Sequence, residues 1–228
     1  MKAFTSFRPT RPGAVLAGLA LLWLAGPAGA GVLELSFNEE DSPEPVADVV
    51  VMVTSPQSVS PVQAVMGQKN RAFVPDLLVV PRGSEVNFPN NDNTQHHVYS
   101  FSAAKTFNIE LYADEPPRPI TFDTVGIVEL GCNIHDTMQA FIVVTGTPHV
   151  ARSGAAGIAR LEVPDQLLDS DGKLAVRIWH PRLPDNTSAQ TLSLSGPFPI
   201  RQRLALELTP EPADTDGFGG LQERFRNL

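Results

Sequence analysis

Proline and glycine divide this chain into short apolar runs, and no long segment has apolar residues at helical spacing. The 228 residues include 21 prolines and 17 glycines, and the Val, Leu, Ile and Phe runs between them are short. Both residues disfavour a helix interior, and proline also removes a backbone donor. Residues 32–37 alternate apolar and polar, as in a strand with one buried face, whereas the apolar run 46–53 indicates a strand covered on both faces. We therefore expect an all-β protein.

The first thirty residues have the pattern of a secretory signal peptide. Three basic residues precede an apolar run at 14–25, and small residues follow at 28–30. A run of twelve residues is short for a bilayer span. We expect cleavage after Ala30 and an exported, periplasmic product that has no membrane span.

The charge balance limits the classes of partner. Residues 1–30 contain three of the 17 basic residues and none of the 25 acidic ones, so their removal leaves 14 basic and 25 acidic residues. Such a surface repels nucleic acid and favours a basic partner.

The only cysteine, Cys132, begins a short run of metal-binding side chains. His135 and Met138 follow at intervals of three residues. A thiolate, an imidazole and a thioether are three of the four ligands of a type 1 copper centre, whose fourth ligand is a second histidine. His96 and His97 open a strand-like run upstream, and strand alternation places them on opposite faces without choosing between them. The competing interpretation of Cys132 is a buried, inert thiol.

The sequence around these residues predicts a loop between two strands. Strand-like runs at 126–130 and 140–145 flank the Cys–His–Met segment. A short loop can turn all three side chains toward one ion, although the spacing alone would also suit one face of a helix. A stiff scaffold of this kind suits a copper ion that changes charge with little rearrangement.

Two segments resemble a known family. The segment 88–96, Phe-Pro-Asn-Asn-Asp-Asn-Thr-Gln-His, is similar to the one before the first copper histidine of plastocyanins and amicyanins. The Cys-x₂-His-x₂-Met spacing resembles amicyanin most. Other short runs of the sequence, including His-His-Val-Tyr-Ser-Phe and Ile-Trp-His-Pro-Arg, resemble those of exported proteins labelled methylamine utilization proteins.

The resemblance implies a cupredoxin domain over residues 62–146, a Greek-key β-sandwich that carries one electron between redox partner proteins. It implies one type 1 copper ion with the ligands His96, Cys132, His135 and Met138. It selects His96, because His97 falls where the family usually has an asparagine that ties the ligand loops together. Asn90 or Asn91 could supply that bracing instead. The sequence departs from the family in two places: Asp136 stands where a proline is frequent, and no aromatic residue occupies the four positions before Cys132.

The remaining strand-like runs predict a second, small β-sandwich. Residues 31–60 and 147–209 together supply about six strands and resemble Ig-like or transthyretin-like (carboxypeptidase-regulatory) domains. We expect the cupredoxin domain to be inserted into this sandwich, and residues 210–228 to form a polar tail. The second sandwich offers no catalytic residues and suits a scaffold or docking surface.

Three other functions compete with electron transfer. Copper nitrite reductases and multicopper oxidases need more histidines than the five present, so we expect no enzyme. A copper-delivery protein would offer several Met or His residues on mobile segments. In a metal-free adhesion module the ligand spacing would be accidental, and we expect His149 and His180 to be structural.

Overall fold

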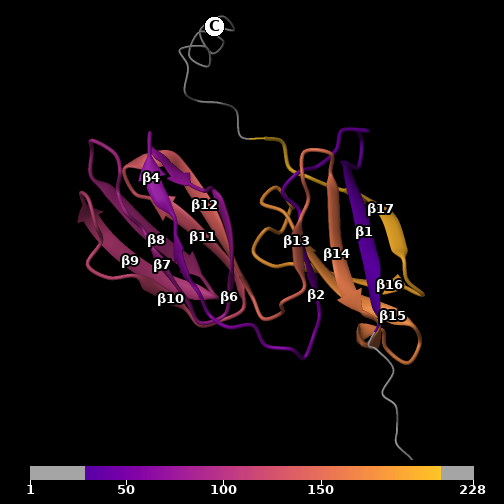
Figure 1. Ribbon diagram of the computed structural model, residues 1–228. Helices are drawn as coiled ribbons and strands as arrows, with labels where there is room; N and C mark the ends of the chain where they lie inside the picture. Colours follow the sequence, from indigo (N-terminus) through magenta and orange to yellow (C-terminus); the bar gives the residue numbers. More distant parts are fainter. Residues whose placement is uncertain (1–28, 212–228) are drawn as a thin grey trace, which may run out of the picture.

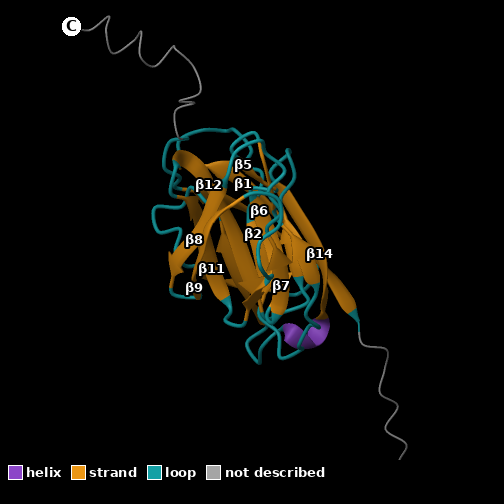
Figure 2. Cartoon of the chain, turned by 90° about the vertical axis from the view of Figure 1, so that its left-hand side faces the viewer, coloured by secondary structure: helices purple, strands orange, loops and turns teal. Residues whose placement is uncertain are grey.

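A computed structural model describes residues 29–211, apart from the side chain of Asp136, so the predicted leader and most of the tail lie outside the described residues. These residues form strands and one 3₁₀ turn, which confirms the all-β expectation. None of the described helices is long and apolar enough to cross a membrane. Figure 1 shows two β units side by side, and Figure 2 shows the 3₁₀ turn at one end.

The first unit holds two sheets and a hairpin. Its strands are β3 (Gln63–Val65), β4 (Gly67–Lys69), β5 (Ala72–Val74), β6 (Leu77–Pro81), β7 (Ser84–Asn87), β8 (His96–Ser102), β9 (Lys105–Tyr112), β10 (Ile120–Phe122), β11 (Gly126–Cys132) and β12 (His135–Thr145). One sheet has the order β6-β12-β11-β8-β9 and the other β10-β7-β3, while β4 and β5 pair with each other. Non-consecutive neighbours, such as β8 beside β11, give Greek-key crossovers. Large side chains such as Phe88, Phe122 and Leu130 fill this unit's core.

The second unit is built from both ends of the chain. Its elements are β1 (Ala30–Glu39), β2 (Val50–Val53), β13 (Val150–Arg152), β14 (Ile158–Pro164), the turn η1 (Asp165–Leu167), β15 (Lys173–Trp179), β16 (Gln190–Ser195) and β17 (Ile200–Leu206). Its sheets have the orders β14-β1-β17 and β13-β2-β15-β16. Because β1 and β2 pair with strands that follow residue 147, we propose that residues 62–146 are inserted into this second sandwich.

A shared apolar cluster joins the two units. Leu77, Ile127 and Phe141 lie on one face of the five-stranded sheet and cluster with Met52 and Trp179 of the second unit. The rings of Phe141 and Trp179 have centroids 5.1 Å apart. Burial of these large side chains couples the stability of one unit to the other.

Residues 68–74 do not form one strand, because β4 and β5 are separated by a turn in which Asn70 and Arg71 have φ of 54° and 60°. One local expectation was wrong. The Cys–His–Met segment was expected to be a loop. Instead β11 ends at Cys132 and β12 already begins at His135, so only two residues form the turn. Cross-strand hydrogen bonds therefore continue closer to the cysteine than the sequence suggested.

Candidate metal centre

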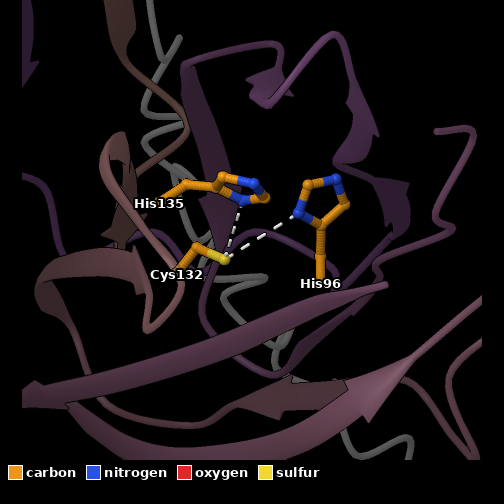
Figure 3. Close-up of side chains that lie close together, drawn as sticks. All are labelled: His96, Cys132 and His135. Carbon is orange, nitrogen blue, oxygen red and sulfur yellow. Dashed lines mark hydrogen bonds between the residues drawn. The ribbon is translucent and has the colours of Figure 1, made fainter. Parts of the chain in front are cut away.

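Three strand ends bring three metal-binding side chains to one point. His96 opens β8, Cys132 closes β11, and His135 opens β12. Figure 3 shows both imidazole rings turned toward the Cys132 sulfur. The pairing of Cys132 with His135 includes a register shift at the end of β11, which turns the cysteine out of the regular ladder.

The distances suit a shared metal ion. Cys132 Sγ lies 3.8 Å from His96 Nδ1 and 3.7 Å from His135 Nδ1. Bonds of about 2.3 Å to sulfur and about 2.0 Å to nitrogen, as for zinc, place the two atoms about 3.7 Å apart at a trigonal angle. The two rings have centroids 4.9 Å apart and are inclined by 56°. The donor atoms thus fit one ion in a His₂Cys plane.

Burial prepares these groups for coordination. His96 and Cys132 are buried, and His135 is half-buried. Burial, and then the charges of His96 and Arg71, lower the pKa of His135. A neutral imidazole with a free nitrogen lone pair is the form that binds a metal.

Asp92 fixes the orientation of His96. Its carboxylate lies 2.8 Å from His96 Nε2 and also accepts the backbone N–H groups of Asn70, at 2.7 Å, and Arg71, at 2.8 Å. Burial acts to raise the pKa of Asp92, but the hydrogen bonds from Arg71, His96 and Asn70 outweigh it and lower that pKa. A carboxylate that accepts the Nε2 proton leaves Nδ1 free to face Cys132, the arrangement that metal-binding histidines use.

Buried hydrogen bonds hold the loop before His96. Asn90 donates from Nδ2 to the carbonyls of Thr94, at 2.8 Å, and Tyr112, at 3.0 Å. Tyr112 in turn donates to the Phe88 carbonyl at 2.5 Å, and burial raises its pKa to about 12. The phenol therefore stays protonated and keeps this bond at neutral pH. Asn90 therefore braces the loop of the first histidine. Its side-chain bonds go to Thr94, Tyr112 and Asp92, so they do not tie this loop to the Cys132 segment as suggested for Asn90 or Asn91.

The other sequence candidates lie in distinct places. Met138 is buried in the same apolar cluster as Cys132. The structure brings His96 rather than His97 to the cysteine; His97 packs on Tyr99 with centroids 5.4 Å apart. His149 hydrogen-bonds to Gln57, and His180 is buried and accepts the N–H of Arg182. That His96, Cys132, His135 and Met138 are the ligands is our proposal.

Sequence reasoning missed Asp92. An acidic residue four positions before a proposed ligand histidine was the signal in the sequence that could have indicated it. It also missed Tyr99, which lies directly opposite Gly131 across the β8–β11 pair. The sequence comparison considered only the four residues before Cys132 on its own strand. It therefore did not predict an aromatic side chain supplied by the neighbouring strand β8.

Comparisons with known proteins found similarity in structure alone. No protein-family model and no curated protein matches the chain. Amicyanin from Paracoccus versutus (Thiobacillus versutus) is 20% identical, with a TM-score of 0.34, over 42% of this chain and 97% of amicyanin. A purple cupredoxin from Nitrosopumilus maritimus is 21% identical, with a TM-score of 0.31, over 37% of this chain and 99% of that protein.

A match to the copper-containing nitrite reductase of Thermus scotoductus SA-01 covers only 25% of that enzyme, with 20% identity, 42% of this chain and a TM-score of 0.36. Scores of this size support no inference about activity. By their own strand order and by the His–Cys–His cluster, the β3–β12 strands form a cupredoxin-like sandwich.

Proposed function

We propose that this protein is a mononuclear type 1 copper protein that carries one electron at a time between redox partners. The observation that carries the proposal is the convergence of one ligand atom each from His96, Cys132 and His135 within 4.8 Å of one another. Imidazole and thiolate together, with a weak thioether, are the donor set of such centres. When bound, the copper supplies a site that accepts and releases one electron.

The protein's own residues keep that site rigid. Asp92 and Asn90 hold the loop of His96, and the two-residue turn between β11 and β12 fixes Cys132 relative to His135. Met138 is buried in the apolar core that also contains Cys132. Groups that are already in place need little rearrangement when the charge at the centre changes.

The test is reconstitution of the chain from Gly31 onward with Cu(II). We expect an intense visible absorption from thiolate-to-copper charge transfer and the EPR signal of a type 1 centre. Cys132→Ser should abolish the visible band, His96→Ala should weaken copper binding, and His97→Ala should leave both signals intact. A colourless, weakly bound copper complex would overturn the proposal.

Enzymatic activity is the main competing function. Nitrite is the substrate to test, because copper nitrite reductases are the enzymes weighed in the sequence analysis and need further histidine ligands. We expect no turnover, because residues 29–211 form one cluster of three or more His, Cys, Asp or Glu side chains suited to a metal. Steady nitrite reduction by the loaded protein would favour the enzyme.

The acidic composition supports a basic redox partner, and the leader pattern supports a periplasmic location.

A further inference from the structure

One arginine lies at the margin of the contact between the two units. Along β15, Val176 and Ile178 belong to the core of the second sandwich, so strand alternation turns Arg177 and Trp179 the other way, toward the first unit. Trp179 is buried in the shared apolar cluster. Arg177 is half-buried and stands opposite Met52, another member of that cluster, across the β2–β15 pair.

The Arg177 guanidinium lacks the acceptors that its burial calls for. Among the arginines of residues 29–211, only Arg177 and Arg182 are half-buried, and the others are exposed. Arg182 donates to the Thr209 carbonyl, at 2.6 Å, and to two carboxylates, whereas the side chain of Arg177 has no acceptor within residues 29–211. A guanidinium has five N–H donors, and a buried charge is normally paired. The alternative role for such a side chain is to cover apolar surface with its stem while its head stays in water.

A groove of about 560 Å³ lies between the two units at this arginine. We call it the Arg177 groove, and its lining consists of residues 101–104, 124–127, Glu129, Arg177 and 186–188. A smaller hollow, of about 160 Å³, shares only Arg177 and Val125 with it. The arginine therefore borders open space on two sides, and the larger groove has the size of a site for a small organic molecule.

The Arg177 groove is separate from the candidate metal centre. β8 begins at His96 and reaches the groove at Ser102, and β11 reaches Cys132 from Gly126, which also lines the groove. Six residues of strand correspond to about 20 Å. A ligand at this end of the strands can therefore be tested without a metal, and the inference does not rest on the proposed function.

Hydrogen bonds fix the wall that the second unit supplies. Trp179 donates from Nε1 to the Asn186 carbonyl at 2.8 Å, and Asn186 donates from Nδ2 to the Pro181 carbonyl at 3.0 Å. The hydroxyls of Thr187 and Ser188 both donate to the carboxylate of the preceding Asp185, at 2.6 and 3.0 Å. Because this loop is tied to a buried tryptophan, the wall is in place before any ligand arrives.

The charges and the apolar surface of the groove select a class of ligand. Arg177 and Glu129 are the two charged side chains of its lining, and Glu129 accepts a hydrogen bond from Gln139 rather than from Arg177. One negative charge in the lining disfavours a dianion such as phosphate or sulfate. Val125 and Ala104 add apolar surface on the side of the first unit. The groove therefore suits a single negative charge on an apolar body.

We propose that the Arg177 groove binds an organic monocarboxylate. The planar guanidinium of Arg177 donates two parallel hydrogen bonds to the carboxylate, a geometry that lysine does not offer. The apolar body of the acid lies against Val125 and Ala104. This carboxylate belongs either to a free small acid or to the C-terminus of a peptide. The second sandwich thus gains a binding role, because neither unit alone supplies both the arginine and the opposite wall.

The test is a titration of the metal-free chain from Gly31 onward, followed by ¹H–¹⁵N NMR. Benzoate represents a free acid, and N-acetylphenylalanine represents a peptide C-terminus. We expect saturable shifts at residues 102–104, 124–127 and 186–188 and at the side-chain N–H of Arg177. Benzamide has the shape of benzoate without its charge and should cause none of them. The tighter of the two acids identifies the source of the carboxylate.

Two pairs of variants separate the charge at the site from the charge of the whole chain. Arg177→Gln should raise the dissociation constant of the bound acid by about tenfold, the effect of losing hydrogen bonds to a charged group. Arg203→Gln removes the same charge from an exposed position outside the groove and should leave that constant unchanged. Thr124→Glu adds a competing carboxylate to the groove and should prevent binding, whereas Thr124→Gln has the same size and should retain it.

Four results would overturn the Arg177 groove. Neither acid binds saturably; binding persists in Arg177→Gln; sulfate binds as tightly as benzoate, which would assign the site to inorganic anions; or Arg177→Gln unfolds at a lower temperature than Arg203→Gln, which would show that the guanidinium already has a partner within the fold. A copper-loaded protein without the visible band would contradict the proposed function and leave these outcomes as they are.

Discussion

At the scale of single residues, Asp92 connects the candidate metal centre to the rest of the fold. Its two carboxylate oxygens are shared between His96 and the turn at residues 70–71. The left-handed conformation of Asn70 and Arg71 directs both backbone N–H groups at the same carboxylate. One side chain thus sets the orientation of a ligand and satisfies the donors of a tight turn.

Asp92→Asn should weaken copper binding by roughly 10–100-fold, the usual cost of losing a partner that orients a metal-binding histidine. The amide keeps the size of the side chain but replaces one acceptor by a donor, so His96 loses the group that selects its Nε2-protonated tautomer. Competition against a chelator of known affinity measures the change.

Asp123→Asn is the matched control for this substitution. Asp123 is exposed and pairs only with Lys105, at 3.9 Å, so its loss should leave copper affinity unaltered. Equal affinities for Asp92→Asn and the unmodified protein would show that Asp92 does not orient the ligand.

At the scale of elements, the pairing of β8 with β11 decides what surrounds Cys132. Gly131 faces Tyr99 across this pair, and the lack of a side chain on Gly131 lets the ring lie close to the backbone. Alternation along β8 then places His96 toward the cluster and Tyr99 on the outer face. The same strand therefore supplies a proposed ligand on one side and an aromatic side chain on the other.

Gly131→Ala should displace the Tyr99 ring and destabilise the protein by about 1 kcal/mol, the low end for overpacking, because the ring can swing outward. Urea unfolding measures the free energy, and the tyrosine NMR signals report the ring. In the control Gly154→Ala, where an added Cβ meets nothing within 4 Å, stability should stay the same or rise slightly. An unmoved Tyr99 signal in Gly131→Ala would contradict the close contact.

At the scale of the whole molecule, the shared apolar cluster makes one stable body of two sandwiches. Trp179 is fully buried in this cluster, where it packs on Phe141 and also holds the Asn186 loop. The cluster therefore holds the Asn186 loop of the second unit in place as well as contributing to stability.

Trp179→Ala should cost about 3–5 kcal/mol and should separate one cooperative thermal transition into two. Calorimetry measures both effects. Leu35→Ala, in the core of the second unit alone, is the comparison: it should lower the transition temperature without separating the units. If Trp179→Ala still unfolded in one step at an unchanged temperature, the two units would not be coupled through this cluster.

The sequence by itself determined the all-β class and the local spacing of Cys132, His135 and Met138, because short-range patterns of Pro, Gly and alternating apolar residues act within a few positions. The residue pattern left His96 and His97 open, and only the family resemblance favoured His96. The pairing of Asp92 with the turn at 70–71 and the contact of Tyr99 with Gly131 were decided only by tertiary structure. Each joins segments more than twenty residues apart or depends on strand register, and a slip of one residue would reverse every face. Local sequence patterns predict which segments form strands and which metal-binding side chains lie near one another in the chain. The pairing of distant strands decides which side chains come into contact.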